Sequence, residues 1–163
     1  PMLHPERAVE ELEHAASLGL RGAMLYAHVA GRYLDDTAFR PVFEAAEALD
    51  LTIQIHPTHP LSANLLETGF LITAVGYLFD TTTAALRLIQ DGIYEDIPRL
   101  KLHLCHVGSL LPYVIERIDF QASLFPQDVA KLSSPPSEHN TTHTTKTPER
   151  QHSPQQTYRS DFS

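Results

Sequence analysis

The sequence of 163 residues predicts an α/β fold, namely a partial TIM (β/α)8 barrel of about three β/α units with a disordered C-terminal tail. Segments with helical and strand periodicity alternate between residues 5 and 125. One of the strand-like segments has an apolar face and a polar face. Histidines end two of these segments, at the sheet edge where parallel α/β folds collect their ligands.

The first part of the chain predicts a helix, a strand and a second helix. Apolar residues recur at helical spacing over residues 5–19, with Pro5 in the first turn and Gly19 as a stop. The segment RGAMLYA, residues 21–27, follows as a strand. Residues 35–50 carry a second apolar stripe, and Asp36 or Thr37 is the expected N-cap of that helix.

The segment LTIQIH, residues 51–56, predicts a strand whose two faces differ. Its apolar residues alternate with polar ones, and the polar face ends at His56, directly before Pro57. A buried strand of an ordinary parallel sheet is apolar on both faces, whereas a barrel strand turns one face toward the lumen. The alternation therefore favours a barrel, with His56 at its mouth.

The next part predicts a helix over residues 80–92, a strand over residues 99–106 and a helix over residues 111–125. The first of these helices has Asp80 or Thr81 as its expected N-cap. The strand ends at His106, which shares its parity with the apolar residues of the strand. A regular strand would therefore point His106 away from the lumen, so it must lie beyond the strand end, where the Gly108 turn re-aims it.

Composition narrows the classes of function. A net charge of −8 argues against nucleic acid or an anionic membrane as the partner. The longest uninterrupted apolar run, residues 69–79, is shorter than the roughly 18 residues that span a bilayer. The single cysteine, Cys105, fits a reducing compartment, so a cytoplasmic protein is expected. The charged N-terminal residues predict no signal peptide, and Pro1 in place of Met predicts a piece of a longer protein.

Residues 133–163 differ in composition from residues 1–132. They are rich in Ser, Thr, Pro, Gln and His, and they show no periodicity. Such a segment buries too little apolar surface to offset its ordering entropy, so we predict disorder here and one barrel domain over residues 1–132. The histidines His139, His143 and His152 fit a weak metal-binding tract less well than a solvated extension.

From about Pro5 to Asp119, the motifs together resemble those of one family. They are GRYLDDTAFRPVFEAAEALDLTIQIHP, FDTTTAALRLIQDG and HVGSLLPYVIERID. The chain resembles the amidohydrolase-related metalloenzymes, in the branch of aminocarboxymuconate semialdehyde decarboxylase and the dihydroxybenzoate decarboxylases. The resemblance implies a metal-dependent TIM barrel that removes the carboxylate of a small aromatic or unsaturated acid, or hydrolyses a C–N or C–O bond.

The resemblance also implies roles for three residues. His56 matches the metal-binding histidine of the HP strand end, and His106 matches the proton-transfer histidine of the HxG motif. Arg117 matches an arginine that, in some decarboxylases, reaches the substrate carboxylate in a neighbouring subunit, which implies a homo-oligomer. The implied cofactor is a divalent metal, zinc in the first place and manganese as the alternative. These residue types suit metal ligation, proton transfer and carboxylate binding.

Two parts of the family pattern have no match in this chain. The family begins with an H-x-H or E-x-H pair on the first strand and ends the site with an aspartate in a GSDYP-like context. With about three of the eight strands present, we expect an internal fragment. The alternative function is therefore a truncated, inactive fragment, a pseudoenzyme or an interaction module.

Other candidate residues have simpler structural interpretations. His59 could chelate a metal with His56, but an exposed loop histidine is the simpler interpretation. His103 and Cys105 could join His106 in a zinc site or a nucleophilic pair, but alternate strand residues point to opposite faces. Arg32, Asp35 and Asp36 of GRYLDD could contact a substrate, but helix capping accounts for the two aspartates.

Overall fold

The computed structural model describes residues 1–145. Its α-helices are α1 (Pro5–Ser17), α2 (Arg40–Ala48), α3 (Ala63–Leu66), α4 (Gly69–Leu71), α5 (Tyr77–Gln90), α6 (Ile93–Asp96), α7 (Cys105–Gly108), α8 (Leu111–Leu124) and α9 (Pro136–His143). Its strands are β1 (Gly22–Tyr26), β2 (His28–Val29), β3 (Arg32–Tyr33), β4 (Thr52–His56), β5 (Lys101–Leu104) and β6 (Thr144–Thr145). It also has two 3-10 helices, η1 (Thr37–Phe39) and η3 (Pro126–Val129), and one π-helical segment, η2 (Ile72–Gly76).

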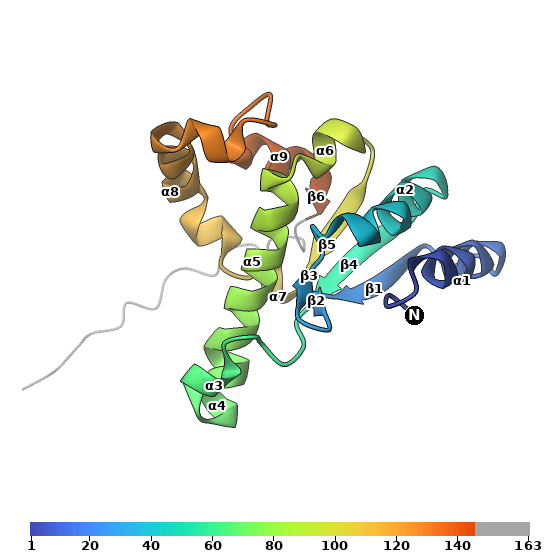
Figure 1. Cartoon of the computed structure of the whole chain (residues 1–163), viewed down its shortest axis with the longest axis horizontal. Helices are drawn as coiled ribbons and strands as arrows, with labels where there is room; N and C mark the ends of the chain where they lie inside the picture. The colour runs from blue at the N-terminus through green and yellow to red at the C-terminus, as the bar shows by residue number, and fades with distance from the viewer. Residues whose placement is uncertain (146–163) are drawn as a thin grey trace, which may run out of the picture.

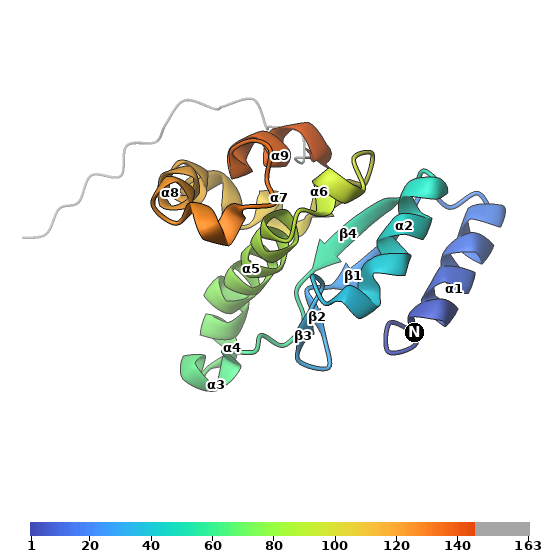
Figure 2. The same ribbon diagram turned by 45° about the horizontal axis from the view of Figure 1, so that its top comes forward.

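A parallel sheet organises the chain. Its strand order is β1-β4-β5-β6, and each neighbouring pair is parallel. The helices α1, α2, α5 and α8 fan out around the strands (Figures 1 and 2). The carboxyl ends of β1 and β4 meet beside α7 and the small antiparallel hairpin of β2 and β3 (Figure 1). This arrangement confirms the predicted α/β architecture and the parallel pairing of its strands.

The two faces of the sheet differ as the alternation in β4 predicts. Ile53 and Ile55 have no exposed surface and pack into the core, whereas Gln54 and His56 are half-buried on the other face. On that other face, Met24 and Gln54 are register partners, and Tyr26 is the partner of His56. A cavity of about 300 Å³ lies there, lined by Gly22, Ala23, Met24, Thr52, Gln54 and His103. The polar face of β4 therefore lines an open concave surface, as a barrel lumen requires.

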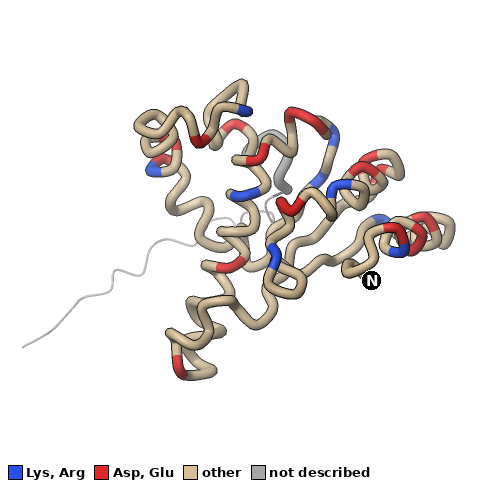
Figure 3. The backbone as a smooth tube through the Cα atoms, viewed as in Figure 1, with Lys and Arg blue, Asp and Glu red and all other residues tan. Residues whose placement is uncertain are grey.

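The buried core lies between the sheet and the helices. Phe43 of α2 and Leu88 of α5 are each 1% exposed and belong to one continuous cluster with Ile53. This burial follows from the amphipathic sequence of the helices, whose apolar stripes face the strands. Figure 3 shows most Lys, Arg, Asp and Glu residues on helices and loops, and β1 and β4 carry none of these residue types.

The helix predicted to begin at Asp80 or Thr81 begins earlier, so that N-cap prediction is wrong. A continuous helical segment runs from Gly69 to Gln90, and Thr68 caps it by accepting a hydrogen bond from the Leu71 amide at 3.3 Å. This segment is long and apolar enough to cross a membrane by length and composition alone. A buried carboxylate in its middle and an apolar face packed on the sheet are typical of a core helix instead.

The prediction of disorder from residue 133 onward is wrong for residues 133–145. These residues form α9 and β6, and β6 pairs with β5. The Glu95 carboxylate accepts hydrogen bonds from the amide and hydroxyl of Ser133, both at 2.8 Å. The buried His139 ring stacks on Tyr94 with the ring centroids 6.2 Å apart. Polar contacts and stacking thus order a segment with few apolar residues. The rest of the predicted tail, residues 146–163, lies outside the described residues.

Candidate functional site

His56 lies at the C-terminal end of β4, on the concave face of the sheet. Its ring Nδ1–H donates a hydrogen bond to the backbone oxygen of Pro57 at 2.7 Å, because a carbonyl can only accept. The neutral ring therefore keeps its lone pair on Nε2. A metal-binding histidine typically donates its other ring N–H to a carbonyl or carboxylate in this way. The local geometry of His56 thus fits a metal ligand.

His106 lies beyond the end of a strand, and its ring faces that of His56. The strand β5 ends at Leu104, earlier than the predicted strand 99–106. The backbone then turns with φ of 56° at His106, and the ring centroids of His56 and His106 are 5.7 Å apart. The structure therefore places the two histidines together, and it re-aims His106 by a change of backbone conformation rather than by strand parity.

The turn that carries His106 has unusual backbone geometry. Four successive residues have positive φ, and for the β-branched Val107 (57°) this conformation is unfavourable. Hydrogen bonds hold the turn: the Ser109 hydroxyl donates to the Cys105 oxygen at 3.1 Å, and the Leu110 amide donates to the Thr82 hydroxyl at 3.0 Å. Such strain costs about 1–3 kcal/mol per residue and concentrates at functional sites. Among the described residues, this turn has the longest run of positive φ angles, and it carries His106.

The environment of His106 favours its neutral form. Burial lowers the pKa of His106 from its usual value, and the nearby His56 lowers it further. Both effects disfavour a positive charge on the ring. At neutral pH His106 is therefore a base with an available lone pair, as proton transfer requires.

The described residues do not by themselves form a ligand set of the kind found in known metal sites. Within residues 1–145, no group of three or more His, Cys, Asp or Glu side chains could hold a metal ion. A catalytic zinc site normally has three protein ligands and an open position. His56 alone does not make up such a ligand set.

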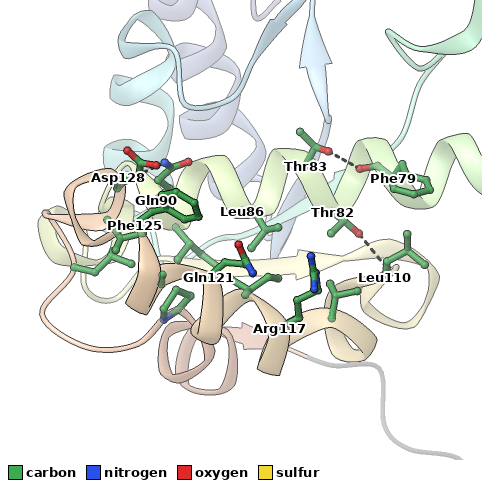
Figure 4. A pocket seen from close by; sticks show the side chains of 17 residues that line it. Phe79, Thr82, Thr83, Leu86, Gln90, Leu110, Arg117, Gln121, Phe125 and Asp128 are labelled. Atoms are coloured by element: carbon green, nitrogen blue, oxygen red, sulfur yellow. Dashed lines mark hydrogen bonds between the residues drawn. The ribbon is translucent and has the colours of Figure 1, made fainter.

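Arg117 does not lie with the two histidines. It projects from α8 toward α5 and lines a cavity of about 480 Å³ (Figure 4). The walls are mainly apolar and include Phe79, Leu86 and Phe125, and neither His56 nor His106 contributes to them. The structure therefore does not bring the exposed Arg117 together with His56 and His106.

The other candidate residues have structural roles in the described part of the chain. The buried Cys105 thiol accepts a hydrogen bond from the Gln54 amide at 2.9 Å, as expected of a packed thiol. Asp36 accepts a hydrogen bond from the Ala38 amide at 2.9 Å and caps the 3-10 segment η1, as predicted. Asp35 pairs with Arg87 through two contacts, of 2.8 and 2.7 Å.

Asp80, Tyr33 and His28 form a polar cluster that the sequence patterns above do not predict. Asp80 is 4% exposed, and its Oδ1 accepts a hydrogen bond from the Tyr33 hydroxyl at 2.9 Å. Its Oδ2 lies 3.7 Å from His28 Nε2. Burial raises the pKa of Asp80, while Tyr33 and His28 oppose that rise. A signal was present in the sequence, because Asp80 shares the i, i+4 stripe of the buried Ala84 and Leu88.

The same cluster predicts one unusual tyrosine. Burial and the hydrogen bond to Asp80 raise the pKa of Tyr33 to about 12. In an absorbance titration of tyrosinate at alkaline pH, one phenol is expected to ionise near pH 12, well above the usual value of about 10. The Tyr33→Phe variant should lack this late phase and keep the others. A late phase that persists in Tyr33→Phe would contradict the assignment.

Comparison with known proteins identifies the family and the fold. A family model described as amidohydrolase matches residues 1–154. The 6-methylsalicylic acid decarboxylase of Penicillium expansum is 34% identical over 131 residues, which cover 78% of this chain and 40% of that protein. The crystal structure of 5-carboxyvanillate decarboxylase from Sphingomonas paucimobilis has a TM-score of 0.82 at 33% identity, covering 88% of this chain and 45% of that one.

A further solved structure holds a metal. The dihydroxybenzoic acid decarboxylase of Polaromonas sp. JS666, with bound manganese and the inhibitor 2-nitroresorcinol, has a TM-score of 0.78 at 27% identity. It covers 88% of this chain and 47% of that one. The chain thus spans about two fifths of the curated relative's length and just under half of each solved chain. The expected partial TIM barrel is confirmed, and the match over residues 1–154 shows that the chain belongs to the amidohydrolase family.

Proposed function

We propose that this chain carries part of the active site of a metal-dependent decarboxylase that acts on a small aromatic carboxylic acid. The observation that carries the proposal is the pair of His56 and His106, held 5.7 Å apart at the carboxyl end of the sheet. The relatives named above support it, because each is a decarboxylase of an aromatic acid.

His56 would hold a divalent metal through Nε2, since Nδ1 is already bound to the Pro57 oxygen. Manganese is the first metal to test, because a solved relative binds it, and zinc is the second. The metal would bind and polarise the oxygen atoms of the acid.

His106 would transfer the proton. In the reaction, the bond between the ring carbon and the carboxylate breaks, CO2 leaves, and the electron pair remains on the ring carbon, which takes up one proton. The neutral imidazole of His106 would take that proton from solvent water and pass it to this carbon. Its lowered pKa suits this task at neutral pH.

Arg117 would bind a carboxylate in a neighbouring subunit of a homo-oligomer. Two observations support this proposal. Arg117 is exposed on α8, and the cavity that it lines includes neither His56 nor His106. A planar guanidinium donates two parallel hydrogen bonds to a carboxylate. We further propose a cytoplasmic location, which is supported by the single free cysteine, Cys105.

Release of CO2 tests the proposal. The purified protein, loaded with Mn²⁺ or Zn²⁺, is incubated with 2,6-dihydroxybenzoate or 6-methylsalicylate, and the CO2 is measured. Metal-dependent release that a chelator abolishes is the expected result. A protein that binds metal and releases no CO2 from any hydroxybenzoate would contradict the proposal.

The alternative is an inactive fragment, a pseudoenzyme or an interaction module. The absence of a complete ligand group within residues 1–145 favours it. A protein with neither bound metal nor CO2 release would support this alternative and end the decarboxylase proposal.

A further inference from the structure

Hydrogen bonds hold the loop after β4 at both of its ends. At the first end, the Ala27 amide donates to the His56 oxygen at 2.9 Å. At the second end, His28 Nε2–H donates to the His59 oxygen at 3.1 Å. Between these points lies Pro57, whose oxygen accepts the hydrogen bond from the His56 ring. The orientation of that ring therefore depends on a short loop fixed on either side.

The second attachment rests on a buried carboxylate. The His28 side chain is 10% exposed, and its Nε2 lies 3.7 Å from Asp80 Oδ2. Asp80 Oδ2 accepts no hydrogen bond from the described residues, so the carboxylate holds the His28 ring through electrostatic attraction alone while Nε2–H donates to the His59 oxygen. Tyr33 donates to the other oxygen of Asp80 at 2.9 Å and so fixes the carboxylate in place. The α5 helix, the β2–β3 hairpin and the loop of residues 57–59 thus meet at one polar cluster.

We infer that His28 and Asp80 are positioning residues for the metal ligand: they fix the loop of residues 57–59 so that the His56 ring keeps its proton on Nδ1 and presents Nε2. Neither residue touches the metal or the substrate. The inference rests on the proposed function, because it assigns a task at the same site. The inference also predicts that the cluster of His28, Tyr33 and Asp80 controls the affinity of the His56 site for metal.

The test measures the His56 ring itself. In protein labelled with ¹⁵N in its histidine rings, two-dimensional NMR distinguishes a ring nitrogen that carries hydrogen from one that does not. In the metal-free wild-type protein, His56 is expected to show one tautomer, with hydrogen on Nδ1. In His28→Ala the two nitrogen shifts should move toward each other, because the ring then samples both tautomers. Mn²⁺ affinity should fall about 10- to 100-fold, as for lost outer partners of metal ligands.

Two variants separate positioning from general destabilisation. His28→Gln retains an amide N–H that can reach the His59 oxygen, so it should restore the single tautomer and most of the Mn²⁺ affinity. Asp80→Asn faces His28 with a second donor and should act like His28→Ala to a lesser degree. The matched control is Asp35→Asn, which removes a carboxylate paired with Arg87 at 2.7 Å and should leave both measurements unchanged.

The tautomer readout needs no metal, so it can fail independently of the proposed function. An unchanged His56 tautomer in folded His28→Ala protein would overturn the inference, even if the protein proves to be a metalloenzyme. A changed tautomer in His28→Ala that His28→Gln does not restore would also overturn it, since the effect would then arise from lost packing. Folding of each variant is checked by circular dichroism at the temperature of the NMR measurement.

Discussion

Replacing His106 with glutamine is expected to lower the rate of CO2 release about 10²- to 10⁴-fold, the usual contribution of a positioned acid–base group. Glutamine fills a similar volume but cannot take up a proton and release it again at neutral pH. The bound metal should remain, because His56 is unchanged. The measurement is kcat for CO2 release, together with the metal content of the same preparation.

His103→Gln provides the matched control. His103 is a half-buried histidine on β5, three residues before His106. It is the register partner of Gln54, which lies two residues before His56 on β4. Its replacement should leave kcat within a few-fold of wild type. If His106→Gln and His103→Gln lose the same activity, the proton-transfer role of His106 is wrong.

Replacing Phe43 with alanine is expected to lower the free energy of unfolding by about 3–5 kcal/mol, the usual cost of removing a buried aromatic ring. Phe43 is 1% exposed and belongs to the cluster that joins α2 to the sheet. The loss combines the transfer energy of the ring with the cavity that remains. Urea denaturation followed by circular dichroism measures it.

The control for Phe43 is Phe70→Ala on α4. Phe70 is 76% exposed, so the same change of residue type removes little buried surface and should cost well under 1 kcal/mol. Equal losses in both variants would show that the core does not lie between α2 and the sheet.

Much of the fold could be predicted because the spacing of apolar residues along the chain distinguishes its helices from its strands. The alternation in residues 51–56 predicted both the buried face of β4 and the concave face that carries His56. The four helical stripes correspond to α1, α2, α5 and α8. Strand parity even predicted that His106 had to lie past the end of β5.

The remaining features depend on contacts between distant residues. Asp80 lies on the buried i, i+4 stripe of α5, but its hydrogen bond to Tyr33 of the β2–β3 hairpin depends on tertiary packing that no local pattern encodes. The hydrogen bonds that join Ser133 to Glu95 link distant residues, which composition could not reveal. A resemblance could suggest a role for Arg117, but only the structure shows that it lies in the cavity between α5 and α8. Tertiary contacts override local signals in these places.

The measurement that tests the central claim most directly is pulsed EPR of the protein loaded with Mn²⁺. An imidazole nitrogen bound to Mn²⁺ modulates the spin echo, so the method detects the ligand itself rather than its effect on activity. We expect this modulation in the wild-type protein and in His59→Ala, which removes an exposed histidine of the same loop. We expect loss of the modulation in His56→Ala. Modulation that persists in His56→Ala, or its absence from the wild-type protein, would contradict the assignment of His56 as the metal ligand.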